Sequence, residues 1–440
     1  MTDLRRRLPS VDAVLAWDEV AVLMGQHPRA AVVDAVRGAL GERRAAGAGD
    51  EDLGTDVAMR LRPSMQRVIN ATGVVLNTNL GRAPLADAAI RATAAASGYA
   101  SVEWDVREGR RASRDGHVAD HLAAACGAPA AAVVNTNAGA VLLALCALAG
   151  ADAAGPREVV VSRGQLVEIG GGFRVPDVLE ASGCRMVEVG TTNRTRLDDY
   201  EAAIGPRTAA ILRVHRSNFR MEGFVAEPGL EELARLARRA GLVLIDDIGG
   251  GLLAPDPLLP DEPDARAGVA AGAVVCFSAD KLMGGPQAGV VVGPDQAVGS
   301  VARHPLARAL RVDKLRLAAL EATLRLHRDP AEARRTVPAL RVLHEEPAAR
   351  RARADRLVGL AGGEPVATAG VVGGGTAPGV ELPSWGVALH DDNPEERARR
   401  LRAGEVPVAA LIREGRLLLD VLAVDEAELD ELARLVAASA

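Results

Sequence analysis

Short apolar runs recur through the middle of the chain, and each is rich in β-branched residues and bounded by turn residues. Such runs predict buried strands, here at residues 131–134, 158–162, 186–189, 209–214, 243–247, 274–277 and 290–292. Helical patterns, such as the one at residues 230–239, lie between several of them. Strands that alternate with helices indicate a mostly parallel sheet covered on both faces, with a site at the carboxyl ends of the strands.

The pattern changes on both sides of this central region. Residues before it show helical spacing, with a helix cap expected around Ser10 and a connector at residues 45–54. Strand-like residues follow at 68–69 and 74–76. After Pro305 we expect helices at residues 307–328, 330–353 and 426–437 and strands near 379–382, 409–412 and 417–421. The chain is therefore predicted to form three domains, at residues 1–62, 63–305 and 306–440.

Lys281 stands between two of the predicted buried strands, in the stretch VVCFSADKLMGGPQAGVVVG (residues 274–293). A charged ammonium is costly away from water, so such a lysine is usually paired, neutral or covalently occupied. One interpretation is a Schiff-base lysine that holds pyridoxal phosphate (PLP), with the glycines allowing close approach of the backbone. The other is a surface lysine on a hairpin, and this stretch alone favours neither.

The stretch GLVLIDDIGGG (residues 241–251) predicts a buried strand that ends in two aspartates and a glycine-rich turn. PLP needs a carboxylate against its pyridine nitrogen, because the protonated ring is the electron sink for a carbanion. Asp247 stands at a strand end ahead of Lys281, which is the order found in aspartate-aminotransferase-like enzymes. Ordinary turn chemistry explains one aspartate of the pair, Asp246 or Asp247, equally well.

A polar turn joins a strand to a helix of small residues in PAAAVVNTNAGAVLLALCAL (residues 129–148). Free backbone N–H groups at the start of a helix form an anion site. We therefore expect the cofactor phosphate at this turn, which consists of Asn135, Thr136, Asn137, Ala138 and Gly139.

Two groups of arginines suit phosphate contacts. One is an arginine-rich loop at residues 107–114, for which salt bridges to Glu103, Asp105 and Glu108 are the alternative. The other lies in the N-terminal helical region and consists of Arg5, Arg6, Arg7, Arg37, Arg43 and Arg44. This second group would suit a phosphate backbone, although a solvated surface is the commoner explanation.

Composition excludes several classes of function. The net charge of −6 argues against a protein that coats nucleic acid, and 2% aromatic residues argue against base stacking. The four cysteines show no metal-binding or disulfide spacing and are expected in the core of a protein in a reducing compartment. Because no apolar run reaches transmembrane length, we expect a cytoplasmic protein without a membrane partner.

Several motifs together resemble the bacterial selenocysteine synthases, the PLP-dependent L-seryl-tRNA(Sec) selenium transferases. The resemblance extends over essentially the whole chain. It rests on INATGVVLNTNLGRAPL (69–85), EGRRASRDGHV (108–118), VEIGGGFRVPDV (167–178), EVGTTNRTRLDDY (188–200), VHRSNF (214–219), FSADKLMGGPQAGVVVG (277–293), HPLARALRVDKLRLAALEATLRL (304–326), VGGGTAPGVELPSW (372–385) and REGRLLLD (413–420). It implies PLP fold type I, with a large α/β domain, a small C-terminal α/β domain and a helical N-terminal domain that docks tRNA.

The resemblance also implies roles for individual residues. Lys281 would hold PLP, Asp247 would pair with the pyridine nitrogen, and Asp280 would handle a proton. His215 and Asn218 would contact the cofactor near its 3-oxygen. The basic positions that match sites for the selenium donor or the cofactor phosphate are Arg82, Arg308 and Arg311.

The implied reaction converts seryl-tRNA(Sec) to selenocysteinyl-tRNA(Sec). Lys281 would remove the α-proton, loss of water would leave an aminoacrylyl-tRNA, and selenophosphate would add selenium at Cβ. The fold class implies at least a dimer, and the family implies a homo-oligomer that forms a decameric ring of dimers.

Three small departures from the family pattern lie on backbone-contact elements, at Thr136, Gly250 and Ala279. PLP binding is expected to survive them, whereas they leave the selenium step open. Two alternatives therefore stand beside the selenium transferase. One is a PLP-dependent β-eliminating lyase for a small amino acid or amino-sugar acid, and the other is a tRNA-binding protein with an inactive site. The helical N-terminal domain argues against the lyase, and the intact Lys281, Asp280 and Asp247 argue against the inactive site.

Overall fold

The computed structural model describes residues 8–439 and divides into two compact units. The first unit extends to Val68 and includes the short segment Ala403–Pro407. The second consists of Ile69–Arg402 and Val408–Ala440. In the described part of the chain, no helix is both long enough and apolar enough to cross a membrane. The division into domains at residues 1–62, 63–305 and 306–440 stays a prediction.

The first unit is a bundle of helices. They are α1 (Val11–Leu15), α2 (Asp18–Gln26), α3 (Arg29–Ala46) and α4 (Leu53–Leu61). The Ser10 side chain accepts a hydrogen bond from the Ala13 N–H, which caps α1 as the sequence indicates. Apolar side chains at helical spacing form the core, among them Val14, Val32, Val36, Leu40, Leu53 and Val57. Arg43 pairs with Asp56 at 2.6 Å, and Arg5, Arg6 and Arg7 lie outside the described residues.

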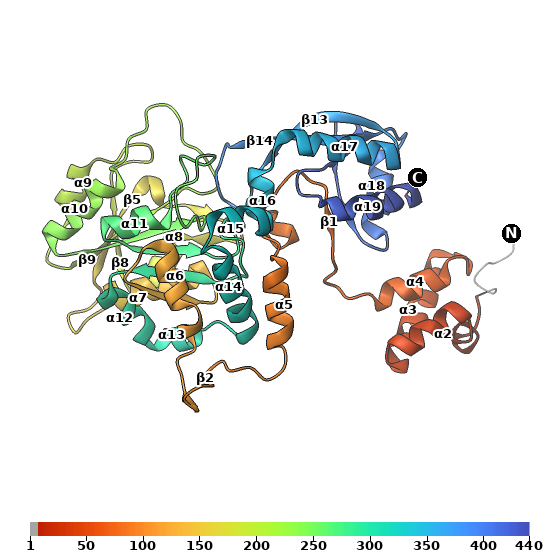
Figure 1. Cartoon of the computed structure of the whole chain (residues 1–440), viewed down its shortest axis with the longest axis horizontal. Helices are drawn as coiled ribbons and strands as arrows, with labels where there is room; N and C mark the ends of the chain where they lie inside the picture. The colour runs from red at the N-terminus through yellow and green to blue at the C-terminus, as the bar shows by residue number, and fades with distance from the viewer. Residues whose placement is uncertain (1–7, 440) are drawn as a thin grey trace. The chain divides into compact units, whose positions relative to one another are not determined.

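A seven-stranded sheet forms the centre of the second unit (Figure 1). Its strands, in spatial order, are β4 (Ala130–Val134), β12 (Gly289–Gly293), β11 (Val274–Ser278), β10 (Val243–Gly249), β9 (Thr208–Val214), β5 (Glu158–Ser162) and β8 (Arg185–Val189). Strand β12 runs antiparallel to both of its neighbours, and the other pairings are parallel. The predicted mostly parallel sheet is thus confirmed.

Helices cover both faces of this sheet, because successive residues of a strand point to opposite faces. Val160, Ile211 and Val275 pack against one set of helices, and Val159, Leu212 and Cys276 pack against the other. The first set consists of α6 (Ala119–Cys126), α9 (Leu197–Ala203), α10 (Leu230–Ala240), α11 (Ala265–Ala271) and α14 (Lys314–Leu326). The second consists of α7 (Asn137–Ala149), α8 (Val175–Ala181) and α12 (Asp295–Arg303). Three cysteines are buried and Cys146 is partly buried, and none forms a disulfide.

The helical region after Pro305 is more divided than its sequence pattern suggests. Its helices are α13 (Pro305–Ala309), α14, α15 (Pro330–Thr336), α16 (Pro338–His344) and α17 (Pro347–Ala361). Asp313 caps α14 and so separates it from α13, while prolines begin α15, α16 and α17. Helix α14 packs along α5 (Asp87–Ala96), as Figure 1 shows.

A second, antiparallel sheet lies near the C-terminus. In spatial order it contains β13 (Glu364–Val371), β14 (Glu381–Leu389), β17 (Arg416–Asp420) and β16 (Leu411–Arg413). Helix α17 packs on β13 and β14, and α18 (Pro394–Ala403) and α19 (Leu429–Ala438) complete this region. The remaining short elements are β1 (Ile69–Asn70), β2 (Trp104–Asp105), β3 (Arg110–Arg111), β6 (Glu168–Ile169), β7 (Phe173–Arg174), β15 (Val408–Ala409), η2 (Thr78–Leu80), η3 (Asp115–His117), η4 (Arg163–Gln165) and η5 (Glu426–Glu428).

Residues 69–76 are bound along their length to this C-terminal region. β1 pairs with β15, Thr72 bridges to Asp420, and Val74 bridges to Val371. The prediction of a strand at residues 74–76 is therefore wrong: only Val74 forms a bridge, and Val75 and Leu76 lie in the turn that precedes η2.

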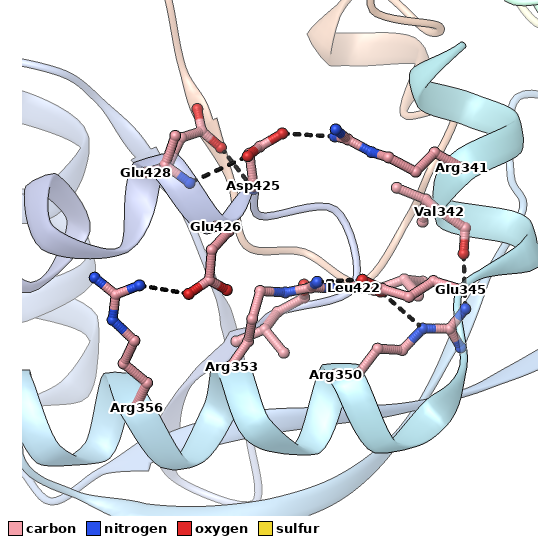
Figure 2. Close-up of polar contacts among 12 residues, drawn as sticks. Arg341, Val342, Glu345, Arg350, Arg353, Arg356, Leu422, Asp425, Glu426 and Glu428 are labelled. Atoms are coloured by element: carbon pink, nitrogen blue, oxygen red, sulfur yellow. Dashed lines mark hydrogen bonds and ion pairs between the residues drawn. The ribbon is translucent and has the colours of Figure 1, made fainter. Parts of the chain in front are cut away.

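Charged side chains join α16 and α17 to the segment after β17, as Figure 2 shows. Arg350 donates to the carbonyls of Val342 and Pro383. Arg353 forms a two-point contact with Glu345. The other pairs join Arg341 to Asp425, and Arg356 to Glu426 and Asp430. We call this set the arginine network.

Candidate active site

Lys281 lies in the turn between β11 and β12, and its side chain is buried. The residue is 5% exposed, so the alternative of a surface lysine does not describe this chain. Its Nζ lies 3.3 Å from the Gly375 carbonyl oxygen. Burial, followed by the charge of Arg82, lowers the pKa of Lys281. A lysine in this environment tends toward its neutral, nucleophilic form.

The two aspartates at the end of β10 point to opposite sides of the sheet, because side chains alternate along a strand. Asp246 pairs with Arg213 at 2.8 Å. Asp247 is 3% exposed, and its Oδ1 accepts hydrogen bonds from Asn137 Nδ2 at 2.8 Å and from the Gly249 N–H at 3.1 Å. Burial raises the pKa of Asp247, because neither contact matches its negative charge. The buried carboxylate therefore suits a ligand that brings a positive charge.

Asp280 is also buried, and Arg82 is its partner. Arg82 Nη1 lies 2.8 Å from Asp280 Oδ2, and the side chains are 33% and 9% exposed respectively. The backbone φ of Arg82 is 66°, a left-handed conformation that directs the chain after η2 toward the Lys281 turn. The structure thus brings a guanidinium, a carboxylate and an amine together at one place.

The N-terminus of α7 faces the same pocket through Thr136, Asn137 and Ala138. Thr136 Oγ1 accepts a hydrogen bond from the Gly139 N–H at 3.0 Å and caps the helix. The first N–H groups of a helix have no partner within it and attract anions. Gly289 of β12 makes this arrangement possible, because a Cβ there would lie 2.0 Å from the Thr136 carbonyl oxygen.

The segment after β9 closes another side of the pocket with His215 and Ser217. The His215 N–H donates to the Asp247 carbonyl at 2.9 Å. Ser217 is 1% exposed, and within residues 8–439 its Oγ has no hydrogen-bond partner. Asn218 is exposed, and its side chain donates to the Glu168 carbonyl at 2.9 Å, outside the pocket lining.

These elements surround a pocket of about 390 Å³, within the range for small-molecule sites. Its lining residues are Thr78, Gly81, Arg82, Thr136, Asn137, Ala138, Ile169, Gly170, Phe173, His215, Ser217, Asp247, Gly249, Ser278, Asp280, Lys281 and Gln287. Most of the candidate site residues from the sequence thus meet in one cavity. Thr78, Phe173, Ser217 and Gln287 did not stand out in the sequence, although each lies inside one of the family-like motifs.

Other candidate residues lie away from this cavity. The Asn135 N–H donates to the Leu310 carbonyl, and Gly139 lies behind the Thr136 cap. Arg308 is exposed on α13, and Arg311 lies 3.9 Å from Glu103. Their roles stay predictions, as does that of Asn218.

Glu103 also pairs with two residues of the arginine-rich loop, Arg111 at 3.0 Å and Arg114 at 3.2 Å. Hydrogen bonds from these two guanidinium groups lower the pKa of Glu103. The salt-bridge alternative therefore describes these two arginines.

The residues of the cavity fit PLP. A buried amine, a buried carboxylate and a helix N-terminus match its aldehyde, its ring nitrogen and its phosphate. Buried polar atoms without a hydrogen bond in the described residues, Asn137 Oδ1 and Ser217 Oγ, remain available to a ligand. Within the same residues, no group of three or more His, Cys, Asp or Glu side chains is arranged to hold a metal ion.

The solved structure of a D-glucosaminate-6-phosphate ammonia-lyase has the same fold. It is similar with a TM-score of 0.59 and 21% identity, over 85% of this chain and 96% of that chain. Together with the order of the central sheet, this confirms the predicted PLP fold type I architecture.

Residues 68–425 match the L-seryl-tRNA selenium transferase family, and residues 5–44 match the family called selenocysteine synthase N terminal. An L-seryl-tRNA(Sec) selenium transferase of Geobacter sulfurreducens is 46% identical over 94% of both chains. Another, from Solidesulfovibrio magneticus, is 46% identical over 98% of this chain and 97% of its own. The chain therefore belongs to the L-seryl-tRNA selenium transferase family.

Proposed function

We propose that the chain carries out the reaction for which its family is named, the conversion of seryl-tRNA(Sec) to selenocysteinyl-tRNA(Sec), with PLP as cofactor and selenophosphate as selenium donor. One observation carries the proposal. Lys281 is buried beside Asp247 and the Arg82–Asp280 pair, in a chain that matches selenium transferases from end to end.

Each group of the cavity has a task in this reaction. Lys281 would hold PLP, Asp247 would accept the hydrogen bond of its ring nitrogen, and the N-terminus of α7 would bind its phosphate. When bound, PLP supplies the electron sink for the carbanion at the substrate α-carbon. Because Asp247 is buried, water would screen its interaction with the ring nitrogen only weakly.

Lys281 is also the base that we assign to the α-proton of the seryl group. Its lowered pKa favours the neutral amine that such a base requires. Asp280 lies beside it and would receive or return the proton. Arg82 holds Asp280 and remains one-third exposed, so its guanidinium also provides a positive charge for an anionic selenium donor.

The remaining assignments concern partners. We assign tRNA binding to the helical first unit, whose sequence matches the selenocysteine synthase N-terminal family. We assign Arg308 and Arg311, both exposed, to an anionic substrate. We also propose a homo-oligomer, a decameric ring of dimers. Large apolar side chains on the segment around β2 support contact with another copy, since Tyr99, Trp104 and Val106 are exposed.

The test uses selenophosphate labelled with ⁷⁵Se and the full-length protein loaded with PLP. Label should appear on serylated selenocysteine tRNA and not on ordinary seryl-tRNA. Failure to label the first tRNA, in a protein that eliminates water from free serine, would favour the small-molecule lyase instead. Failure of both reactions in a PLP-free protein that still binds tRNA would favour the inactive tRNA-binding protein.

The chain offers an internal control for the site of PLP attachment. It contains two lysines, the buried Lys281 and Lys314 at the start of α14. Borohydride reduction followed by peptide mass analysis should place the added mass on the peptide with Lys281. Mass on the Lys314 peptide would contradict the assignment.

A further inference from the structure

Glu262 is a buried carboxylate outside the motifs that point to PLP chemistry. It lies in a turn between β10 and α11, where the local sequence Pro-Asp-Glu-Pro-Asp has the composition of a surface loop. Its side chain is nevertheless 1% exposed. A buried carboxylate must find partners, so its contacts indicate what it does.

Those contacts reach one residue of the Lys281 pocket and a loop whose Gly375 carbonyl contacts Lys281. Glu262 Oε2 accepts a hydrogen bond from the Ala377 N–H at 2.8 Å. The same oxygen lies 3.4 Å from Nε2 of His215, which lines the Lys281 pocket. At 3.4 Å this is an ion-pair distance, longer than a good hydrogen bond, and such contacts tighten when a ligand fills the site.

The direction of the proton follows from the chemistry of the two groups. An ionised carboxylate only accepts hydrogen bonds, so the His215 ring must present an N–H to it. With Nε2 directed at Glu262, the imidazole is held in one orientation. Glu262 thus determines which edge of His215 faces the pocket.

The contact with Ala377 acts on a loop that approaches Lys281 from outside the pocket lining. Ala377 belongs to the loop between β13 and β14, and two residues earlier the Gly375 carbonyl accepts from Lys281 Nζ. The loop contains three successive glycines with positive φ, Gly373, Gly374 and Gly375, and Ala377 itself has a φ of 45°. Such a backbone needs an external anchor, and Glu262 supplies one.

Gly250 leaves the space that Glu262 occupies. A Cβ at Gly250 would lie 2.1 Å from Glu262 Oε1. Since this oxygen is the end of a flexible side chain, a larger residue at 250 would displace the carboxylate and leave the backbone in place.

We propose that Glu262 is a positioning residue for selenium transfer, which orients His215 in the Lys281 pocket and anchors the 373–377 loop that contacts Lys281. It touches neither substrate nor cofactor and acts through these two neighbours. The expected effect of Glu262 on kcat rests on the proposed function. The expected effect of Glu262 on the position of His215 and of the 373–377 loop does not.

The first experiment measures hydrogen exchange of the cofactor-free, full-length protein. Glu262→Ala and Gly250→Ala should both raise exchange in peptides that cover residues 214–218 and 372–380. Asp261→Asn is the matched control, because Asp261 is the exposed neighbour that pairs with Arg220. Unchanged exchange in both variants would overturn the inference, whether or not the protein transfers selenium.

The second experiment is kinetic. Glu262→Gln should lower kcat on the order of 10-fold with little change in KM for seryl-tRNA and in Tm. The double variant Glu262→Gln/His215→Ala should be no slower than His215→Ala, because Gln keeps an acceptor for the Ala377 N–H and the remaining effect passes through His215. Multiplicative losses, or a loss of Tm with normal kcat, would overturn the positioning role. A wild-type protein that transfers no selenium would contradict the proposed function, while the exchange result still decides the inference.

Discussion

Two regions of the second unit bury charged side chains, and they differ in how fully those side chains are hydrogen-bonded. In the arginine network of Figure 2, the buried Arg350 and Arg353 donate to carbonyls and to Glu345. Among the described residues, each guanidinium lacks a hydrogen bond only at Nε, and Nε of Arg350 still lies 3.4 Å from Glu345.

The pocket leaves more of its polar atoms without a partner. Within residues 8–439, Asn137 Oδ1 and Ser217 Oγ are buried and form no hydrogen bond, and His215 Nε2 has only the long 3.4 Å contact with Glu262. Burial there shifts the pKa of Lys281 downward and that of Asp247 upward, so the charged form of each group is disfavoured. Satisfied buried charge stabilises a fold, whereas unsatisfied buried charge is kept for a ligand.

The largest effect should come from the pocket and leave the fold intact. Lys281→Ala removes both the attachment point of PLP and the base, so selenium transfer should fall by at least about 10³-fold. The absorbance of bound cofactor should disappear, while Tm stays level or rises because a buried amine has been removed. Cofactor absorbance that persists in this variant would show that Lys281 is not the attachment point.

The arginine network should behave in the reverse manner. Arg350→Met leaves the carbonyls of Val342 and Pro383 without their donor and removes a charge beside Glu345, so the free energy of unfolding should fall by about 3 kcal/mol. Urea unfolding measures this change, with PLP absorbance per folded chain as the second readout. Loss of PLP from the folded protein would break the distinction between the two regions.

The pH dependence of Tm tests whether Asp247 is a buried carboxylate without a matching charge. Because burial raises the pKa of Asp247, the cofactor-free fold binds its proton more tightly than the unfolded chain. This contribution to stability is complete below the ordinary aspartate pKa and is lost as the pH rises through the raised value. Cofactor-free Asp247→Asn should therefore exceed the wild type in Tm at neutral pH by a few degrees, roughly 2–4 °C.

The difference should vanish near pH 4, which is about the ordinary pKa of an aspartate. The measurement is the Tm of the cofactor-free wild type and of Asp247→Asn between pH 4 and pH 8. Parallel curves would show that Asp247 carries no buried, unmatched charge.

The smallest effect is expected next to Arg350 on the same helix. Arg351 is 43% exposed, pairs with Asp355 at 2.9 Å and lies 4.0 Å from the Trp385 ring centre. Arg351→Met should lower the free energy of unfolding by only about 0.5 kcal/mol, as is usual for exposed pairs. A loss as large as that of Arg350→Met would show that burial does not set the contribution of this network.

The sequence pattern locates the strands that are buried on both faces and misses one that is not. The strand at 158–162 has the predicted bounds, because its residues are all buried and mostly β-branched. Strand β13 was not predicted, since its half-exposed residues and Pro365 give little contrast between the faces. The helix predicted at 307–328 is divided, because the cap at Asp313 interrupts a continuous apolar pattern.

Site residues could be predicted where a side chain that PLP requires lies in a recognisable sequence motif. Lys281 and Asp247 carry groups that PLP requires, and both lie in the cavity. Glu262 gives no such signal, because only the folded chain shows that a carboxylate from a polar turn is buried against His215. Long-range contacts of this kind have no local pattern in a sequence.

The bridges that bind residues 69–76 to the C-terminal region have a mechanical consequence. Ala71 exchanges hydrogen bonds with Ala409 and Asp420, and Leu76 donates to Val372. Six residues after Leu76 the chain reaches Arg82, which holds Asp280 beside the lysine. This segment therefore links the C-terminal sheet covalently to Arg82. We expect a displacement of the C-terminal sheet to move Arg82 as well, so that the electrostatic environment of the reactive amine depends on the position of a sheet that contributes no side chain to the cavity lining.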